Sequence, residues 1–247
     1  MSRTPKLCMF CGEEISSVDL TMEHPVPRGL WEQGHRPQGM RTLPAHKTCN
    51  NGFSPDDEYF RNVMLLEDGA VQNCDAARIV DSQTVERMLQ KRPGTLIKAA
   101  KNLREVRVAD ASGNSSIRPV FDVDVSRIER VLFKVMKGIF YIAQKTPMPQ
   151  DFVLEVCDTN LVDGAPFRRT VESMVDWQSF GDDAFQCRYL VIGRPAAAFA
   201  CLMRFYQNRL FYGAALSPPF ADQERSRDVF VPCRKGSSIL VPSWRTH

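Results

Sequence analysis

The sequence lacks any long apolar run, and this absence excludes several classes of protein. No segment of the 247 residues approaches the roughly 20 apolar residues that a membrane-spanning helix needs. The first ten residues, MSRTPKLCMF, also lack the hydrophobic core of a secretion signal. We therefore expect a cytoplasmic protein with no membrane partner.

Histidine is scarce, whereas cysteine is comparatively frequent. The chain has four His and eight Cys residues. In a reducing compartment, cysteines are expected to be metal ligands or buried thiols, not disulfides. Five of them stand alone in the sequence, and we interpret these as small buried side chains. They are Cys74, Cys157, Cys187, Cys201 and Cys233.

The chain has little net charge, only +3, but that charge is unevenly spread. Residues 1–80 carry 8 Lys/Arg and 11 Asp/Glu, residues 81–145 carry 13 and 7, and residues 146–247 carry 11 and 11. A basic middle third fits a phosphate-binding surface, and it fits a solvated helix face equally well. Lys98 and Lys101 lie in this stretch and are candidate contacts to nucleic acid.

Two pairs of metal-binding residue types stand near the N-terminus. Cys8 and Cys11 form one pair, His46 and Cys49 form the other, and 34 residues separate them. Thiolate and imidazole are the ligands that zinc prefers, and four of them complete a tetrahedral structural site. A zinc ion joining both pairs would stabilise a segment too short and polar to fold alone. A redox-active Cys pair remains the alternative.

Local patterns in this segment predict two strands followed by a helix. A short strand is expected over 20–22, and a second over 40–43, where Pro44 would end it. Ser54 has the side chain of a helix cap, and Pro55 suits the first helical position. The acidic residues 56–58 are interpreted as favourable charge at the positive end of the helix dipole, not as metal ligands.

The rest of the chain predicts a larger α+β region without a recognisable catalytic set of residues. Apolar residues at Ile128, Val131, Leu132, Val135 and Ile139 follow the i, i+3, i+4 spacing of a buried helix face. Other elements are predicted from local patterns. They are a helical stretch over 83–104 broken at Pro93, strands over 152–156 and 189–192, and a hairpin of 199–206 with 210–215 around Gln207 and Asn208.

Three segments, CMFCGE, LTMEHPVPRGL and RTLPAHKTCNNGFSPDDEYFR, together resemble the HNH endonucleases of the ββα-metal group. The resemblance covers residues 8–61. It implies a small zinc-stabilised ββα-metal domain in residues 1–76 within an α+β protein. An α+β accessory domain in residues 77–247 would then contact nucleic acid, form a dimer, or bind a partner or trigger.

The resemblance also implies a role for each matching residue. Glu23 and Asn50 would hold a catalytic Mg²⁺ or Mn²⁺ ion. His24 would be the general base that activates water, since imidazole accepts a proton near neutral pH. The implied reaction is hydrolysis of a phosphodiester bond in DNA to a 5′ phosphate and a 3′ hydroxyl, in a setting such as restriction or phage defence.

The implied partner is nucleic acid, with double-stranded DNA as the expected form. Arg28, Arg41 and Lys47 lie near the matching residues and are candidate contacts to it. Cutting both strands of a duplex favours a homodimer, and a partner protein is a further open expectation.

Two positions depart from the family pattern. Arg41 stands nine residues before Asn50, where the family usually has Asn, and Arg cannot accept a hydrogen bond. Pro55 interrupts the family's continuous helix, so a turn is expected over 50–52, left-handed because Asn and Gly tolerate positive φ. These departures leave a second interpretation open: a zinc-containing nucleic-acid binding module that does not cleave, or a nuclease subunit that a partner activates.

Overall fold

The computed structural model describes residues 5–66, 70–81, 104–109, 115–120, 123–159, 164–179 and 184–222. The predicted helical stretch over 83–104, with Lys98 and Lys101, lies outside these ranges except for Arg104, and so does Cys233. The helices and strands confirm an α+β protein. In chain order they are β1 (Leu20–Glu23), η1 (Arg28–Leu30), β2 (Leu43–His46), α1 (Lys47–Asn50), α2 (Ser54–Leu65), η2 (Ala70–Gln72), α3 (Cys74–Asp81), β3 (Arg104–Ala109), β4 (Ser115–Val120), α6 (Val125–Gln144), β5 (Val153–Asp158), α7 (Ala165–Glu172), β6 (Gln178–Ser179), β7 (Phe185–Ile192), β8 (Ala198–Phe205), β9 (Arg209–Leu216) and α8 (Pro218–Ala221).

The strands β1 and β2 form an antiparallel hairpin, in which Leu20 pairs with His46 and Glu23 with Leu43. The predicted first strand is confirmed, but the second runs over 43–46 and not over 40–43. Pro44 therefore lies inside the strand that it was expected to end. The sheet has only two strands, so a residue without an N–H group is tolerated at its edge, and the Pro44 carbonyl accepts a hydrogen bond from Met9 N at 2.9 Å.

A turn separates α1 from α2, as Pro55 predicts, but the turn is right-handed. Asn51 has φ −60°, and Gly52 is not among the residues with positive φ. The predicted start of α2 at Ser54 is confirmed, whereas its role as the cap is wrong. Phe53 is the N-cap, because its carbonyl already accepts the first helical hydrogen bond from Asp57 N at 2.8 Å.

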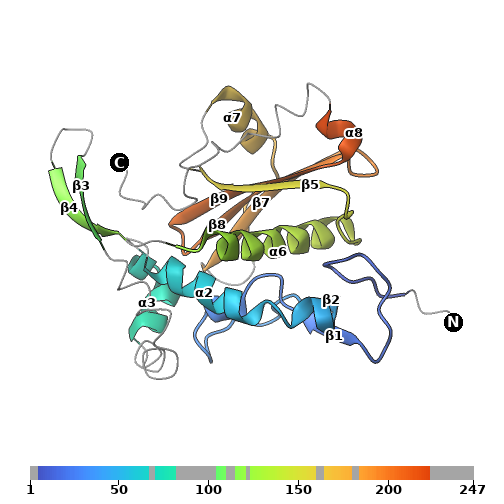
Figure 1. The fold of residues 1–247 in the computed structure, drawn as a ribbon, viewed down its shortest axis with the longest axis horizontal. Coiled ribbons are helices and arrows are strands. Elements are labelled where there is room, and N and C mark those ends of the chain that lie inside the picture. The colour runs from blue at the N-terminus through green and yellow to red at the C-terminus, as the bar shows by residue number, and fades with distance from the viewer. Residues whose placement is uncertain are drawn as a thin grey trace.

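The helix α6 lies across one face of a five-stranded antiparallel sheet, with α7 and α8 on the opposite face (Figure 1). The strand order is β5-β9-β8-β7-β6, so β8 and β9 lie inside the sheet. Both faces of these strands are buried, one against α6 and the other beneath α7 and α8. The predicted apolar face of α6 and the predicted strands of this region are confirmed.

The hairpin of β8 and β9 turns through Tyr206 and Gln207, whose φ angles are +50° and +58°. The predicted hairpin is confirmed, and its turn over residues 206–208 includes the predicted Gln207 and Asn208. A bulky residue with positive φ is unfavourable unless its surroundings hold it. Here the Tyr206 ring is buried, and its hydroxyl donates to the Leu30 carbonyl at 3.0 Å.

Residues on both sides of the predicted boundary at 76 share one hydrophobic cluster. Leu30, Trp31 and Phe60 pack into the same cluster as α6 and the sheet. One close approach is at Gly138 of α6, where an added Cβ would lie 2.1 Å from Pro25 Cβ. The helix α6 therefore lies directly behind the chain that follows β1, while the boundary itself stays a prediction.

The isolated cysteines differ in their exposure. Cys157, Cys187 and Cys201 are buried, as predicted, and burial raises the pKa of Cys187 to about 12. Cys74 is exposed, so its prediction is wrong. It is the first residue of α3, where a side chain need not face the core.

The strands β3 and β4 form a separate antiparallel hairpin that the sequence analysis did not predict. Of their side chains, Glu105, Arg107, Ser115 and Ile117 are exposed. Across the described ranges, no helix combines the length and the apolar character that crossing a membrane requires.

Candidate zinc cluster and the Glu23 cavity

The two predicted pairs of metal-binding residues meet at the open end of the β1–β2 hairpin. The ligand atoms of Cys8, Cys11, His46 and Cys49 all lie within 4.8 Å of one another. We call this set the Cys3His cluster. Ligand atoms around a tetrahedral zinc ion are separated by about 3.5 to 3.8 Å, so modest closure of the cluster would suit zinc.

The ring of His46 is oriented as in a metal site. Its Nδ1 atom lies 3.3 Å from Cys11 Sγ and 4.0 Å from Cys49 Sγ. Its Nε2 atom lies 3.2 Å from the carbonyl oxygen of Glu14. A metal-bound histidine commonly uses its second nitrogen to donate to a backbone carbonyl, which fixes the tautomer. Nδ1 is therefore the candidate ligand atom.

The thiols of the cluster also show the electrostatics of a cation site. Burial raises the pKa of Cys8, but hydrogen bonds with the backbone of Cys11, His46 and Phe10 outweigh it and lower the pKa to about 7. Burial and the neighbouring thiolates of Cys8 and Cys11 raise the pKa of Cys49 to about 12. A divalent cation between the sulfur atoms would remove this repulsion and favour three thiolates.

A cavity of about 360 Å³ adjoins the cluster through Asn50, which follows Cys49. We call it the Glu23 cavity. It combines the end of β1 with the end of α1 and the first turn of α2, and it brings the predicted Glu23, His24, Asn50 and Arg28 together. Its lining residues are Met22, Glu23, His24, Arg28, Asn50, Asn51, Phe53, Ser54 and Asp57.

The amide of Asn50 has a defined orientation. Its Nδ2 donates to Thr21 Oγ1 at 3.2 Å, and Thr21 Oγ1 donates in turn to the Ala45 carbonyl at 2.9 Å. The hairpin thus holds the nitrogen side of the amide. The carbonyl oxygen of Asn50 is left as the atom that could bind a cation.

The surroundings of His24 favour the neutral form of its imidazole. Burial lowers its pKa, the positive charge of Arg28 lowers it further, and Glu23 only partly opposes them. A hydrogen bond to the Arg41 backbone also opposes them, since it raises the pKa of His24. Within the described ranges, the buried Nδ1 atom has no hydrogen-bond partner. A buried, unsatisfied acceptor costs free energy until a partner reaches it.

A buried lysine from α6 pairs with two carboxylates of the Glu23 cavity. The side chain of Lys134 is 0% exposed, and its Nζ lies 2.5 Å from Glu23 Oε1 and 2.7 Å from Asp57 Oδ2. The same Nζ lies 5.4 Å from the centroid of the Phe53 ring. A buried ammonium is tolerated only with such partners. The sequence analysis missed Lys134, because 111 residues separate it from Glu23.

Asp57 is part of the cavity and not only a charge at the end of a helix. Burial raises its pKa to about 6, although the charge of Lys134 opposes the shift. Its buried Oδ1 has no hydrogen-bond partner in the described part of the chain. Lys134 takes one oxygen of each carboxylate, so Glu23, Asp57 and Asn50 still offer oxygen atoms. Oxygen donors are the ligands that Mg²⁺ and Mn²⁺ prefer, so the residues fit such an ion.

The neighbouring acid, Asp56, fastens α2 to α6. Its carboxylate is 4% exposed and lies 2.7 Å from Arg127 Nε and 2.8 Å from Arg130 Nη1. Arg127, Arg130 and Lys134 are spaced i, i+3, i+7 and form a basic stripe beside the apolar face of α6. The basic stripe of α6 and the acidic residues at the start of α2 have opposite charges. This complementarity is the sequence signal that could have predicted the contact.

The predicted nucleic-acid contacts are spread over several places. Arg28 is exposed and lines the Glu23 cavity. Arg41 lines a second cavity, beyond Pro25. Lys47 is exposed, does not line either cavity, and donates to the Val18 carbonyl at 2.8 Å.

Comparison with known proteins gives no match to a family model, to a curated protein or to a solved structure.

Proposed function

We propose that the protein is a metal-dependent endonuclease of the HNH type that hydrolyses phosphodiester bonds in DNA. The observation that carries the proposal is the convergence of Glu23, His24 and Asn50 on one cavity beside the Cys3His cluster. Zinc in that cluster would fix His46 and Cys49, and thereby the adjacent Asn50 and the hairpin that ends at His24.

In this proposal, His24 takes the proton from the attacking water at Nδ1. The lowered pKa supports the role, because a neutral imidazole is the form that accepts a proton at pH 7. The unpartnered state of Nδ1 supports it as well, since no other described group competes for that atom.

Glu23, Asn50 and Asp57 would hold the divalent ion, which supplies positive charge beside the scissile phosphate and the leaving oxygen. Arg28 stands at the same cavity with an exposed guanidinium. It would bind phosphate oxygens through paired N–H groups, which orient the scissile bond towards His24.

One observation favours the second candidate function, a nucleic-acid binding module or subunit that is silent until a partner activates it. The ammonium of Lys134 already pairs with both Glu23 and Asp57 and offsets one of their two negative charges. A divalent ion would meet the repulsion of this positive charge. A partner that moved α6 would weaken that repulsion.

The test is nicking of a supercoiled plasmid by zinc-loaded protein with Mg²⁺, Mn²⁺ or EDTA. We expect cleavage with either ion and none with EDTA. His24→Ala should slow cleavage by about 100-fold or more, the usual contribution of a general base. His35→Ala is the matched control, because His35 lies in an exposed loop with its side chain 54% exposed.

Zinc-loaded wild type that binds DNA and cuts it under none of these conditions would favour the silent module. Equal cleavage by His24→Ala and His35→Ala would remove His24 from the mechanism.

A further inference from the structure

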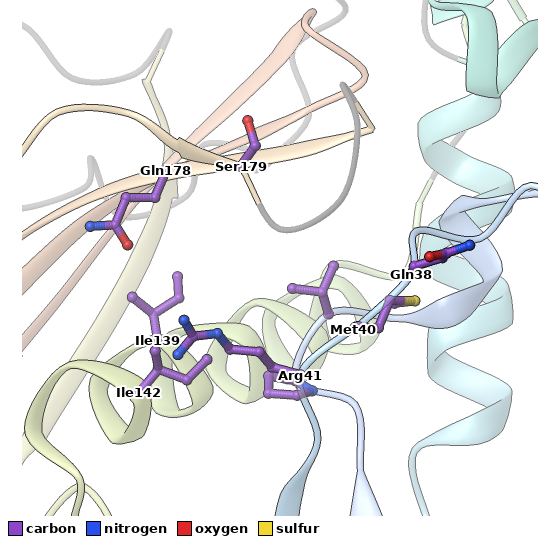
Figure 2. Close-up of a pocket in the computed structure, with 10 residues that line it drawn as sticks. Gln38, Met40, Arg41, Ile139, Ile142, Gln178 and Ser179 are labelled. Carbon is purple, nitrogen blue, oxygen red and sulfur yellow. The ribbon is translucent and has the colours of Figure 1, made fainter.

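A second cavity, of about 240 Å³, lies on the other side of the chain segment that follows His24. We call it the Arg41 cavity. The N-terminal loop, α6 and the short strand β6 each form one of its sides (Figure 2). Its lining residues are Pro25, Val26, Gln38, Gly39, Met40, Arg41, Ile139, Ile142, Gln178 and Ser179.

The floor of the Arg41 cavity is apolar and built into the core. Val26 and Ile139 are 6% and 1% exposed and belong to the main hydrophobic cluster. Ile142 and Met40 extend this apolar surface towards the opening. A flat apolar ligand would therefore be covered by parts of the molecule that are far apart in sequence but fixed relative to one another.

Three polar side chains at this cavity have no partner within the described ranges. Gln38, Arg41 and Gln178 make no side-chain hydrogen bond or ion pair there, unlike Arg127, Arg130 and Lys134, which pair with acids. Figure 2 shows the Arg41 guanidinium reaching over the two isoleucines, with Gln178 on the sheet side. The Gln38 side chain points away from both, so Arg41 and Gln178 are the polar groups over the apolar floor. A few polar groups over an apolar floor are typical of a ligand site.

The chemistry of the lining specifies the kind of ligand. The guanidinium of Arg41 can bind a phosphate through paired N–H groups. The amide of Gln178 offers both a donor and an acceptor, which suits the polar edge of a nucleobase. The volume is below the roughly 300 to 1,000 Å³ of pockets for drug-sized ligands, so a single base fits better than a larger group.

We propose that the Arg41 cavity binds one nucleotide, with its base on the apolar floor and its phosphate on Arg41. The segment that carries His24 also supplies Pro25 and Val26, and the Arg41 backbone bonds the His24 ring. A nucleotide in the Arg41 cavity is therefore adjacent to the Glu23 cavity.

Such a nucleotide has two sources. It is either a base turned out of the DNA strand beside the cleavage point or a free nucleotide that acts as a trigger. Its assignment to the DNA strand rests on the proposed nuclease function, whereas nucleotide binding itself does not.

The test measures binding without cleavage, in EDTA, with zinc-loaded protein. The probes are the four deoxynucleoside 5′-monophosphates, the matching nucleosides, and a 12-residue single-stranded oligonucleotide, each followed by ligand-detected NMR and calorimetry. The variants are Arg41→Gln and Gln178→Leu. Arg36→Gln is the matched control, because it removes the same charge from the same exposed loop outside the cavity.

We expect a deoxynucleoside monophosphate to bind wild type and Arg36→Gln equally. Arg41→Gln should weaken monophosphate binding about tenfold or more, because it removes hydrogen bonds to a charged group. The same variant should leave nucleoside binding unchanged. Gln178→Leu should weaken the binding of both the monophosphate and the nucleoside. It should also reduce the differences in affinity between ligands that carry different bases. Unchanged zinc content and thermal unfolding of the variants would show that the fold is intact.

Displacement of the bound monophosphate by the oligonucleotide would support a base from the strand. Simultaneous binding of both would support a free nucleotide. The proposal is overturned if no monophosphate binds, or if binding is the same in Arg41→Gln, Gln178→Leu and Arg36→Gln. Neither result depends on whether the protein cuts DNA, so the two proposals fail separately.

Discussion

The Cys3His cluster, a candidate zinc site, and the Glu23 cavity, the proposed site of a second cation, are neighbours that are built in different ways. The cluster takes all its ligands from residues 8–49 and contains no positively charged side chain. The Glu23 cavity uses oxygen atoms from β1, α1 and α2, and Lys134 of α6 already supplies a positive charge. A soft sulfur site suits zinc, and a hard oxygen site suits Mg²⁺ or Mn²⁺.

The two sites therefore need different parts of the molecule. The candidate zinc ligands all come from the N-terminal residues, although Lys137 and Gln150 also bond the nearby Phe10 carbonyl. The charge balance of the Glu23 cavity, by contrast, needs a charged side chain from a helix of the larger region. That helix approaches closely only because residue 138 is glycine, opposite Pro25. The region 77–247 is therefore part of the environment of the proposed active site, whatever else it binds.

The largest expected effect separates the two sites by their metals. Cys49→Ser removes one ligand of the Cys3His cluster and leaves the oxygen atoms of the Glu23 cavity in place. We expect zinc to fall from one per chain to nearly none, with a loss of stability on the order of 5 kcal/mol or more. Metal analysis and denaturant unfolding measure both. Cys201→Ala, in the sheet, should keep its zinc, and retention of zinc by Cys49→Ser would contradict the cluster.

The next effect concerns the internal cation. Lys134→Met leaves Glu23 and Asp57 facing each other, so the metal-free protein should lose about 3 kcal/mol, the lower end for one partner of a buried ion pair because both carboxylates are partly exposed. Mn²⁺ should then bind about tenfold more tightly or better, since one competing charge is gone. Unfolding curves with and without Mn²⁺ test this.

Lys137→Met is the matched control for that prediction. Lys137 lies on the same helix, but its ammonium donates to the Phe10 carbonyl at 3.0 Å and not to a carboxylate. Its loss should cost about 1 kcal/mol and leave Mn²⁺ affinity unchanged. An equal gain in Mn²⁺ affinity in both variants would show that Lys134 has no special relation to the cation.

A smaller effect tests the contact between α6 and the His24 segment. Gly138→Ala places a Cβ 2.1 Å from Pro25 Cβ, so one of the two must move. We expect a loss of about 2 kcal/mol, as for other overpacked cores, and slower cleavage. Gly52→Ala is the control, because its nearest neighbour, Arg130 Nη2, lies at an ordinary 3.6 Å. Full activity of Gly138→Ala would show that this contact does not position His24.

The smallest effect, on the order of 1 kcal/mol between pH 5 and 6, is a pH dependence of stability from Asp57. Its pKa rises from 3.8 to about 6 on folding, so the folded protein binds the proton more tightly. The resulting stabilisation is complete below pH 3.8 and is lost as the pH rises to about 6. Stability of wild type should therefore fall between pH 5 and 6 more steeply than that of Asp57→Asn. Parallel unfolding curves of the two proteins over this range would contradict the shift.

The sequence predicted those features that depend on neighbours along the chain. The zinc ligands lie in two local pairs, and the face of α6 follows a helical repeat, so both were found. The end of the second strand was wrongly placed at Pro44. Whether a strand can contain proline depends on how many strands flank it, and the sequence does not show that β2 has only one neighbour. Lys134 and Asp57 were missed as parts of the site because their meeting depends on packing across 77 residues. The Arg41 cavity could not be predicted for the same reason, because segments that are far apart in the sequence line it.

The most direct measurement is diffraction at the zinc and manganese absorption edges from zinc-loaded crystals soaked in Mn²⁺. The account predicts a zinc signal inside the Cys3His cluster and a manganese signal bounded by Glu23, Asn50 and Asp57, with Lys134 displaced. Manganese elsewhere, or none with Lys134 still bound to both carboxylates, would contradict the claim that the molecule holds two cations of different chemistry.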